Sequence, residues 1–330
     1  MPSVVKVRNT KYSPSMFRPG MVGARDKLQW VVSTRNTTIP EDIAYSLFGI
    51  FGVHLPIIYG ENAQNALGRL LQEIVAQSGD ITCLDWVGKP SEFNSCLPAD
   101  ITYYRAPPSA LLPPPSEDDM QMWISKLRDG INAEVASRLY RTLDSMGAPQ
   151  FVSCRLRLPC IAFAVTEFKR KRCDDQQIRC SFVIKADGLR DLSITTEDRL
   201  TTFSRSKPTP GRQAFFLVRP WDRSPLGLSD FADPPDDSDI ESVSDESPPA
   251  SPSHDLSVVS AGENLLEDSE SHSRALRLIV RLGQPFSAFL LAQKQGGEYK
   301  RIASDQHIVA QVKDMTSIYD TMDIRALEIL

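Results

Sequence analysis

The sequence predicts an α+β fold: a short N-terminal helical segment, then a mainly antiparallel β sandwich or barrel that is interrupted by a disordered acidic insert. Three observations support this. Apolar residues recur at helical spacing between residues 33 and 78. From residue 150 they follow the period of two that is typical of strands. Between residues 222 and 273 the apolar pattern gives way to Ser, Pro, Asp and Glu, which bury too little apolar surface to order the chain.

The chain of 330 residues is long enough for two domains, or for one domain with additional segments. The changes of pattern divide it into six parts. In order, we predict an irregular N-terminal segment (1–32), a helical segment (33–104), a Pro-rich link with a helical connector (105–149), the first half of a β-module (150–221), the disordered acidic insert (222–273) and the second half of the β-module (274–330).

The N-terminal part contains the first helix start. Residues 1–32 hold Pro and Gly breakers without a clear period, which predicts mostly loop. Thr38 and Glu41 have the spacing of a capping box, in which their side chains satisfy the first free amides of a helix. The apolar stripe that follows is predicted to stop at Gly49 or Gly52.

Further elements follow up to residue 149. Asn62 is predicted to cap a second helix that ends at Gly79, because the apolar residues between them keep the i, i+3, i+4, i+7 rhythm. Residues 81–87 read as a short strand. After the prolines, Ser116 is expected to start the first of two helices, near 117–129 and 132–146, which are broken around a glycine between them.

The β-module is expected to contain roughly ten strands. Asp-Gly within 186–189 and Gly-Gly within 295–298 are hairpin signals. The spacing of the strands, without helices between them, favours an antiparallel sandwich or barrel. The predicted strands are 151–158, 161–168, 178–186, 191–195, 213–219, 274–282, 286–293, 298–304, 307–314 and 324–330.

The acidic insert determines the charge balance. Residues 230–273 contain thirteen acidic and no basic residues, so the rest of the chain carries +8 although the whole carries −5. Short Ser-acidic and Ser-Pro patterns make Ser238, Ser242, Ser247 and Ser251 candidate phosphorylation sites. An unmodified, solvated linker explains these patterns equally well, because they occur by chance in Ser-rich segments.

One stretch resembles a known family. The sequence "TRNTTIPEDIAYSLFGIFGVHLPIIYGE", residues 34–61, resembles the C-terminal end of the heterokaryon-incompatibility (HET) domain region of fungal proteins. Residues 80–330 look like the extension of a mushroom-type (basidiomycete) subgroup. We interpret the motif residues as structural. They are Arg35, Thr38, Glu41, Asp42, Ala44, Tyr45, Leu47, Gly49, Pro56, Tyr59, Gly60 and Glu61.

The resemblance implies a role in fungal non-self recognition and programmed cell death, and a family core similar to TIR domains. Only 32 residues precede the motif, which favours a residual HET-like segment at 33–104. We therefore expect a non-enzymatic interaction or regulatory protein. Two alternatives stay open: part of a TIR-like NAD-cleaving enzyme whose catalytic core is missing from this chain, or a truncated gene fragment without independent function.

The residues that could take part in catalysis favour a non-enzymatic protein over the two alternatives. Glu41, Asp42 and Glu61 could serve as acid–base carboxylates, but capping and turn formation explain them better. The sequence shows no catalytic, cofactor-binding or metal-ligating constellation, and its six cysteines are expected to be reduced, partly buried thiols.

We name no protein partner. The basic run at 168–173 is better explained as a charged hairpin loop than as a nucleic-acid contact. No apolar run has the length of a membrane span and the N-terminus lacks a signal-peptide core, so we expect a cytoplasmic protein without membrane contact.

Overall fold

The computed structural model describes the chain in ranges separated by gaps. They are residues 23–34, 38–109, 113, 115–128, 130–131, 133–171, 180–198, 200, 203–204, 214–221, 272–316 and 318–330. The expected loop at 1–22, Arg35, the predicted acidic insert up to residue 271 and its four candidate phosphoserines lie outside these ranges.

The structure is α+β, as the sequence predicts. Its helical elements before the sheet are α1 (Ala24–Thr34), α2 (Asp42–Tyr45), α3 (Phe48–Phe51), α4 (Ala63–Ser78), the 3-10 turns η2 (Ile81–Leu84) and η3 (Ile101–Tyr104), α5 (Glu117–Arg128) and α6 (Ala133–Asp144). A further helix covers residues 272–282, and α8 (Ile318–Thr321) precedes the last strand. The strands are β1 (Gln150–Val152), β2 (Arg155–Arg170), β3 (Cys180–Ala186), β4 (Leu192–Thr196), β5 (Phe203–Ser204), β6 (Phe215–Pro220), β7 (Phe286–Gln293), β8 (Tyr299–Ile302), β9 (Ile308–Ala310) and β10 (Asp323–Ile329).

These strands form one 10-stranded sheet, with the main order β10-β8-β7-β6-β2-β3-β4. Because β10 pairs with β2 as well as with β8, strands β2, β6, β7, β8 and β10 close into a ring. Of the two predicted architectures, the pairing is therefore that of a barrel. The pairings are antiparallel except for the one between β10 and β8.

Alternate side chains of the strands point into the ring and form its interior. The rings of Phe216 on β6 and Tyr299 on β8 lie 5.8 Å apart, and the Arg325 guanidinium on β10 lies 4.8 Å from the Phe216 ring. Strands β6 and β8 are not neighbours, so this contact requires the sheet to curve towards these side chains. Leu158 and Cys160 belong to the same apolar cluster.

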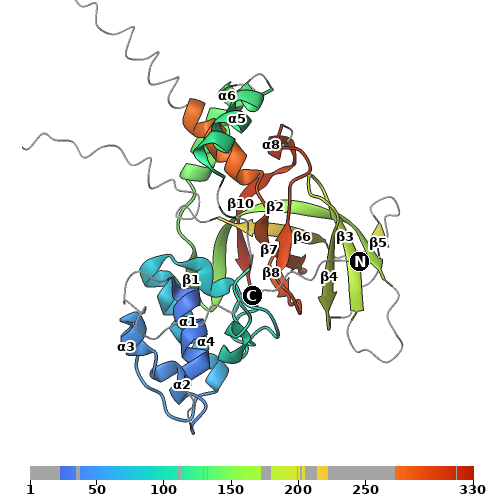
Figure 1. Cartoon of the computed structure of the whole chain (residues 1–330). Helices are drawn as coiled ribbons and strands as arrows, with labels where there is room; N and C mark the ends of the chain where they lie inside the picture. The colour runs from blue at the N-terminus through green and yellow to red at the C-terminus, as the bar shows by residue number, and fades with distance from the viewer. Residues whose placement is uncertain are drawn as a thin grey trace, which may run out of the picture.

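Two layers of helices pack against the sheet (Figure 1). The interior cluster continues without a break into α1 and α4, through side chains such as Leu28 and Leu70. On the other face of the sheet, alternate residues of β2 such as Phe163 pack with α5, α6 and the helix 272–282. Figure 1 shows α1–α4 and the pair α5–α6 at opposite ends of the molecule. Each end therefore has its own apolar core, separated by the sheet.

Several boundaries are as predicted. Asn62 accepts a hydrogen bond from the Gln64 amide and caps α4, and Gly79 closes that helix in the left-handed conformation. The Ser116 hydroxyl accepts from the Asp119 amide at the start of α5. Strands from both sides of the predicted insert pair directly, β6 with β7 and β2 with β10. The division of the chain into six segments stays a prediction.

Four expectations are wrong. Residues 24–34 are helical and not loop, because Ala24, Leu28, Val31 and Val32 share one buried face. The expected strand at 81–87 begins as a 3-10 turn, capped by Asp80, which accepts from the Thr82 amide.

The other two errors concern a helix start and a strand. The structure shows no capping box at Thr38: α2 begins after Glu41, without a side-chain cap. The expected strand at 274–282 lies within the helix 272–282. Its apolar residues are buried on almost every side, including Ala275, Leu276 and Val280, and such a run can be either a strand or a buried helix.

Candidate interaction site

The motif residues gather around one loop, residues 56–61, which joins α3 to α4. The Glu41 carboxylate, only 9% exposed, accepts a hydrogen bond from the Gly60 amide at 3.1 Å. Gly60 has a φ of +82°, a conformation that favours glycine. The Arg69 guanidinium of α4 donates to the Pro56 carbonyl at 2.6 Å. Both ends of the loop are therefore tied to the helices.

Tyr45 holds the middle of the loop. Its hydroxyl accepts from the Ile58 amide at 3.2 Å and lies 2.8 Å from the Ile58 carbonyl. It also donates to the Glu61 carboxylate, which forms an ion pair with Arg69 at 3.5 Å. Burial and the hydrogen bond to Glu61 raise the pKa of the Tyr45 hydroxyl. The phenol therefore stays protonated and keeps its place in this network.

The apolar side chains of the same loop point outward. Ile57 is 52% exposed, Ile58 48% and Tyr59 76%. The Tyr59 and Tyr45 rings are arranged edge to face, with 6.5 Å between their centroids. Large apolar side chains side by side on a surface often mark a binding site. We call Ile57, Ile58 and Tyr59 the apolar loop surface.

The remaining predicted residues have structural positions. Asp42 begins α2, and Ala44 and Leu47 are fully buried beneath it. Thr38 and Gly49 are exposed. The structure therefore brings Glu41, Tyr45, Pro56, Tyr59, Gly60 and Glu61 together around the loop.

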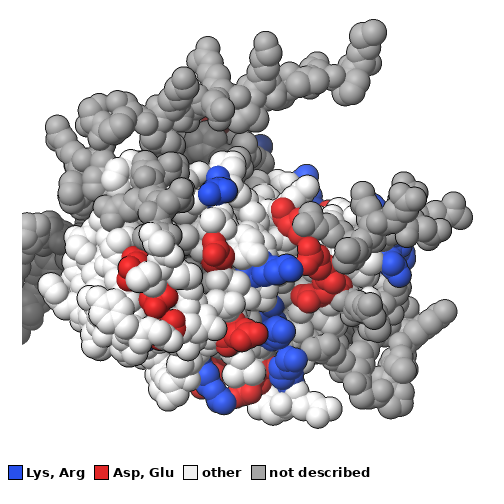
Figure 2. Space-filling view, turned by 90° about the horizontal axis from the view of Figure 1, so that it is seen from below, with Lys and Arg blue, Asp and Glu red and all other residues white. Residues whose placement is uncertain are grey.

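The basic run at 168–173 is described only up to Lys171. Phe168 is buried in the core, and Lys169 pairs with Glu167 at 3.0 Å. On the face shown in Figure 2, acidic and basic side chains are interspersed rather than gathered by sign. Lys185 pairs with the same Glu167 carboxylate at 3.2 Å, so this part of the hairpin is locally neutralised.

The sequence did not indicate two buried arginines, of which Arg301 joins the helical part to the barrel and Arg25 binds carbonyls within the part of the chain before the barrel. Arg301 of β8 lies between the Trp86 and Phe289 rings, at 4.3 and 4.0 Å. It donates to the carbonyls of Leu84 and Trp86, at 2.7 and 3.2 Å. Arg25 of α1 donates to the carbonyls of Asp85, Tyr104 and Ala106. An isolated Arg in an apolar strand is too weak a signal to predict such a contact.

A histidine forms a further link between the helical part and the barrel. His307, just before β9, contacts the Asp85 carboxylate through Nδ1 at 2.8 Å and the Pro107 carbonyl through Nε2 at 2.9 Å. Burial by itself raises the pKa of the Asp85 carboxyl. The bond to His307, the Ser109 amide and the Arg25 charge outweigh burial, and the pKa lies below its ordinary value. Asp85 is therefore a carboxylate at neutral pH.

Cys83, Cys96 and Cys160 are buried free thiols. Burial raises the pKa of Cys96 and of Cys160 to about 12, and that of Cys83 still further. These three thiols consequently stay protonated and pack as apolar side chains. Across the described ranges, no group of three or more His, Cys, Asp or Glu side chains is arranged to hold a metal ion.

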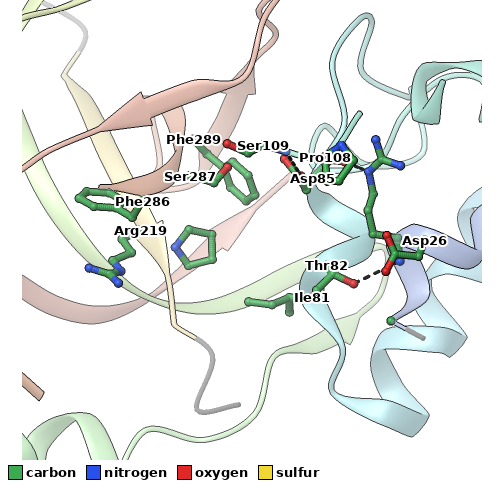
Figure 3. A pocket seen from close by; sticks show the side chains of 13 residues that line it. Asp26, Ile81, Thr82, Asp85, Pro108, Ser109, Arg219, Phe286, Ser287 and Phe289 are labelled. Carbon is green, nitrogen blue, oxygen red and sulfur yellow. Dashed lines mark hydrogen bonds between the residues drawn. The ribbon is translucent and has the colours of Figure 1, made fainter. Parts of the chain in front are cut away.

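A cavity of about 430 Å³ lies between the helical part and the barrel. Figure 3 shows Phe286 and Phe289 of β7 on one side, and Asp26, Ile81 and Thr82 of the helical part on the other. In the part of the chain that the structure covers, no helix has both the length and the apolar character needed to cross a membrane.

Comparison with known proteins connects the chain with vegetative incompatibility. A stretch of 54 residues is 56% identical to the vegetative incompatibility protein HET-E-1 of Podospora anserina. This stretch is 16% of the chain and spans only 4% of the length of that relative. No protein-family model matches the chain, and no solved structure matches it. The similarity is therefore partial and is to a heterokaryon-incompatibility protein.

Proposed function

We propose that this chain is a non-enzymatic interaction or regulatory protein related to fungal heterokaryon incompatibility, acting in the cytoplasm in non-self recognition and cell-death signalling. The partial similarity to HET-E-1 supports the biological context. We infer that the similar stretch includes the motif of residues 34–61, where the resemblance to HET proteins lies. The chain's contribution would be to present its apolar loop surface to a protein partner.

One observation carries this proposal: the loop that exposes Ile57, Ile58 and Tyr59 is held by polar side chains of α4 and of the segment around α2. Glu41 and Arg69 bind its backbone, and so does the Tyr45 hydroxyl. Preorganising an apolar surface reduces the entropy lost when a partner binds. Aromatic and apolar anchors of this kind often dominate the affinity of an interface.

The test is to express the full chain in a fungal strain whose incompatibility response can be scored by growth arrest and dye uptake. We expect the chain to alter the response and Ile58→Asp to abolish the effect, because a carboxylate at the centre of an apolar contact is desolvated without a partner. Met122→Asp is the matched control, since Met122 on α5 is 45% exposed. Identical responses to the parent chain and to Ile58→Asp would contradict the proposal.

A second measurement separates this function from the NAD-cleaving alternative. We expect NAD to remain intact when incubated with the purified chain, because the Glu41 and Glu61 carboxylates are occupied in holding the loop. The measurement is chromatography of the dinucleotide over several hours. Turnover that disappears in Glu41→Gln or Glu61→Gln would favour the enzyme instead.

A further inference from the structure

The cavity between the helical part and the barrel has the size and lining of a small-molecule site. Sites for small ligands typically enclose about 300–1,000 Å³, with mainly apolar walls and a few polar groups that orient the ligand. The cavity of about 430 Å³ falls in this range, and most of its wall is apolar. The apolar lining residues are Ile81, Pro108, Pro220, Phe286 and Phe289.

Walls of this kind suit a hydrocarbon group better than water. An ordered water needs about two to four polar partners, whereas a cavity lined by aliphatic and aromatic side chains can take up an apolar molecule. Phe286 and Phe289 of β7 lie on one side of the cavity and Ile81 on the other (Figure 3). A molecule between them would bury apolar surface on both sides.

The cation on the barrel side is directed away from this space. Arg219 of β6 donates to the Leu282 and Arg281 carbonyls, at 2.9 and 3.5 Å. In Figure 3 its guanidinium points away from the other side chains of the lining. Only the rest of the Arg219 side chain therefore contributes to the wall, and its charge does not attract a ligand anion.

The charges on the helical side are also engaged. The Asp85 carboxylate contacts His307 and accepts from the Ser109 amide. Arg25 donates to three backbone carbonyls. Asp26 lies in the first turn of α1, where the helix dipole favours an acidic side chain. An ionic group on a ligand would lose its hydration here without gaining a free partner of opposite charge, which favours an uncharged ligand.

One polar group of the lining lacks a partner. The Ser109 hydroxyl is enclosed and makes no hydrogen bond within the described ranges, although its amide is bonded to Asp85 at 3.1 Å. A buried hydroxyl without a partner costs stability. Ser109 belongs to the link after η3, and it lies with Ser287 and Phe289 of β7 in the lining (Figure 3). An oxygen atom of a ligand at this place would satisfy the Ser109 hydroxyl.

We propose that this cavity binds a small uncharged molecule that is mainly hydrocarbon and carries one hydrogen-bonding oxygen. The hydrocarbon part would pack between Ile81 and the two Phe rings, and the oxygen would bond to Ser109. Because the walls come from both the helical part and the barrel, the ligand would strengthen the contact between them. The site shares no residue with the apolar loop surface and does not depend on the function proposed for it.

The experiment titrates the full chain with three probes that differ only in the end group: 4-phenyl-1-butanol, 4-phenylbutyrate and 4-phenylbutylamine. Saturation-transfer NMR and calorimetry measure binding. For a ligand of this size we expect a Kd on the order of 1 mM for the alcohol. The acid and the amine should each bind at least about tenfold more weakly, because their charges would be desolvated without a partner. No saturable binding of the alcohol, or equal or tighter binding of either ion, would overturn the proposal.

Two variants test the cavity and the hydrogen bond separately. Ser287→Phe places a ring in the cavity and should abolish binding of the alcohol, whereas Ser145→Phe, at an exposed position after α6, should leave it unchanged. Ser109→Ala keeps the amide bond to Asp85 and should weaken binding of the alcohol by about two- to tenfold. Binding that survives Ser287→Phe would refute the cavity as the site, and unchanged affinity in Ser109→Ala would refute the hydrogen bond.

A measurement on the parent chain keeps the test decisive if Ser287→Phe does not fold. In protein labelled at the isoleucine methyl groups, the ring protons of the alcohol should give nuclear Overhauser effects to Ile81, which lines the cavity. The Ile81 signal is assigned by its loss in Ile81→Val. Effects that reach other isoleucines but not Ile81 would place the probe elsewhere and contradict the proposal.

Discussion

Single side chains join the helical part of this protein to its barrel. Arg301 is one of them, because its buried guanidinium donates to backbone carbonyls of a different segment. Asn94 acts in the same way with its amide, which donates to the carbonyls of Cys154 and Ile329 at 2.8 Å each. Such groups stabilise a fold only while every partner is satisfied.

Replacing Arg301 with Met should therefore destabilise the whole molecule. The change keeps the apolar stem but leaves the carbonyls of Leu84 and Trp86 buried without this donor. We expect a loss of about 3 kcal/mol in the free energy of unfolding. Urea denaturation followed by circular dichroism measures it. Lys300→Met, at the neighbouring exposed position, is the control and should change stability little. A similar loss from both would show that the buried contacts contribute nothing specific.

Asp85 gives the stability an acid-dependent part. Its pKa is lower in the folded protein than in the unfolded chain, so its contribution is complete above the unfolded pKa. The contribution is lost as the pH falls through the folded pKa. We expect the free energy difference between the parent and Asp85→Asn to be constant above about pH 5 and to shrink below about pH 4. Denaturation curves between pH 3 and 7 test this; a difference that grows in acid would show the opposite shift.

At the scale of the element, α4 is a packing unit whose inner face meets both the motif and the barrel. Leu70 and Leu71 are fully buried on it. The outer side of the same helix holds the loop through Arg69. The position of the apolar loop surface therefore depends on how α4 packs, although the buried face of α4 is on the other side of the helix from Arg69.

The change Leu70→Asp should therefore prevent cooperative folding. It places a charge without a partner in the interior cluster, which costs several kcal/mol. Thermal melting followed by circular dichroism should show no cooperative transition, or the protein should be insoluble. Ala76→Asp, on the exposed side of α4, is the matched control and should melt like the parent. A Leu70→Asp variant that melts normally would show that this face is not part of the core.

At the scale of the whole molecule, the sheet connects the two ends of the chain. Strand β2 pairs with β6 and with β10, which lie on either side of residues 222–271. Loop closure entropy increases only with the logarithm of loop length, so a long intervening segment costs little once the strands pair.

Replacing residues 224–271 with a Gly-Ser linker of about ten residues should leave the fold intact and remove most of the acidic charge. The measurement is the melting temperature together with the far-ultraviolet spectrum of the residual sheet. Limited proteolysis of the parent should cut within this segment while the two β-halves stay associated during gel filtration. Unfolding of the deletion variant, or separation of the halves, would show that the segment contributes to the structure.

The sequence alone determined the elements whose local signals agree with their final environment. The cap and glycine stop of α4, the Ser116 cap of α5 and the strand patterns of β6, β7 and β10 are all local signals, and each of these elements forms in the structure. The resemblance around residues 34–61 likewise depends only on spacing along the chain.

Only the tertiary structure decided the rest, because it depends on contacts between distant residues. The run at 274–282 is apolar on nearly every side, and it is a helix because it lies between α5, α6 and the sheet. Glu41 has the spacing of a capping residue, yet its carboxylate binds Gly60. The closure of the ring through β10 and β2, and the contact of Arg301 with Trp86, join residues more than 100 positions apart. No local pattern contains such information, since the free energy that selects these contacts comes from surfaces that meet only in the folded chain.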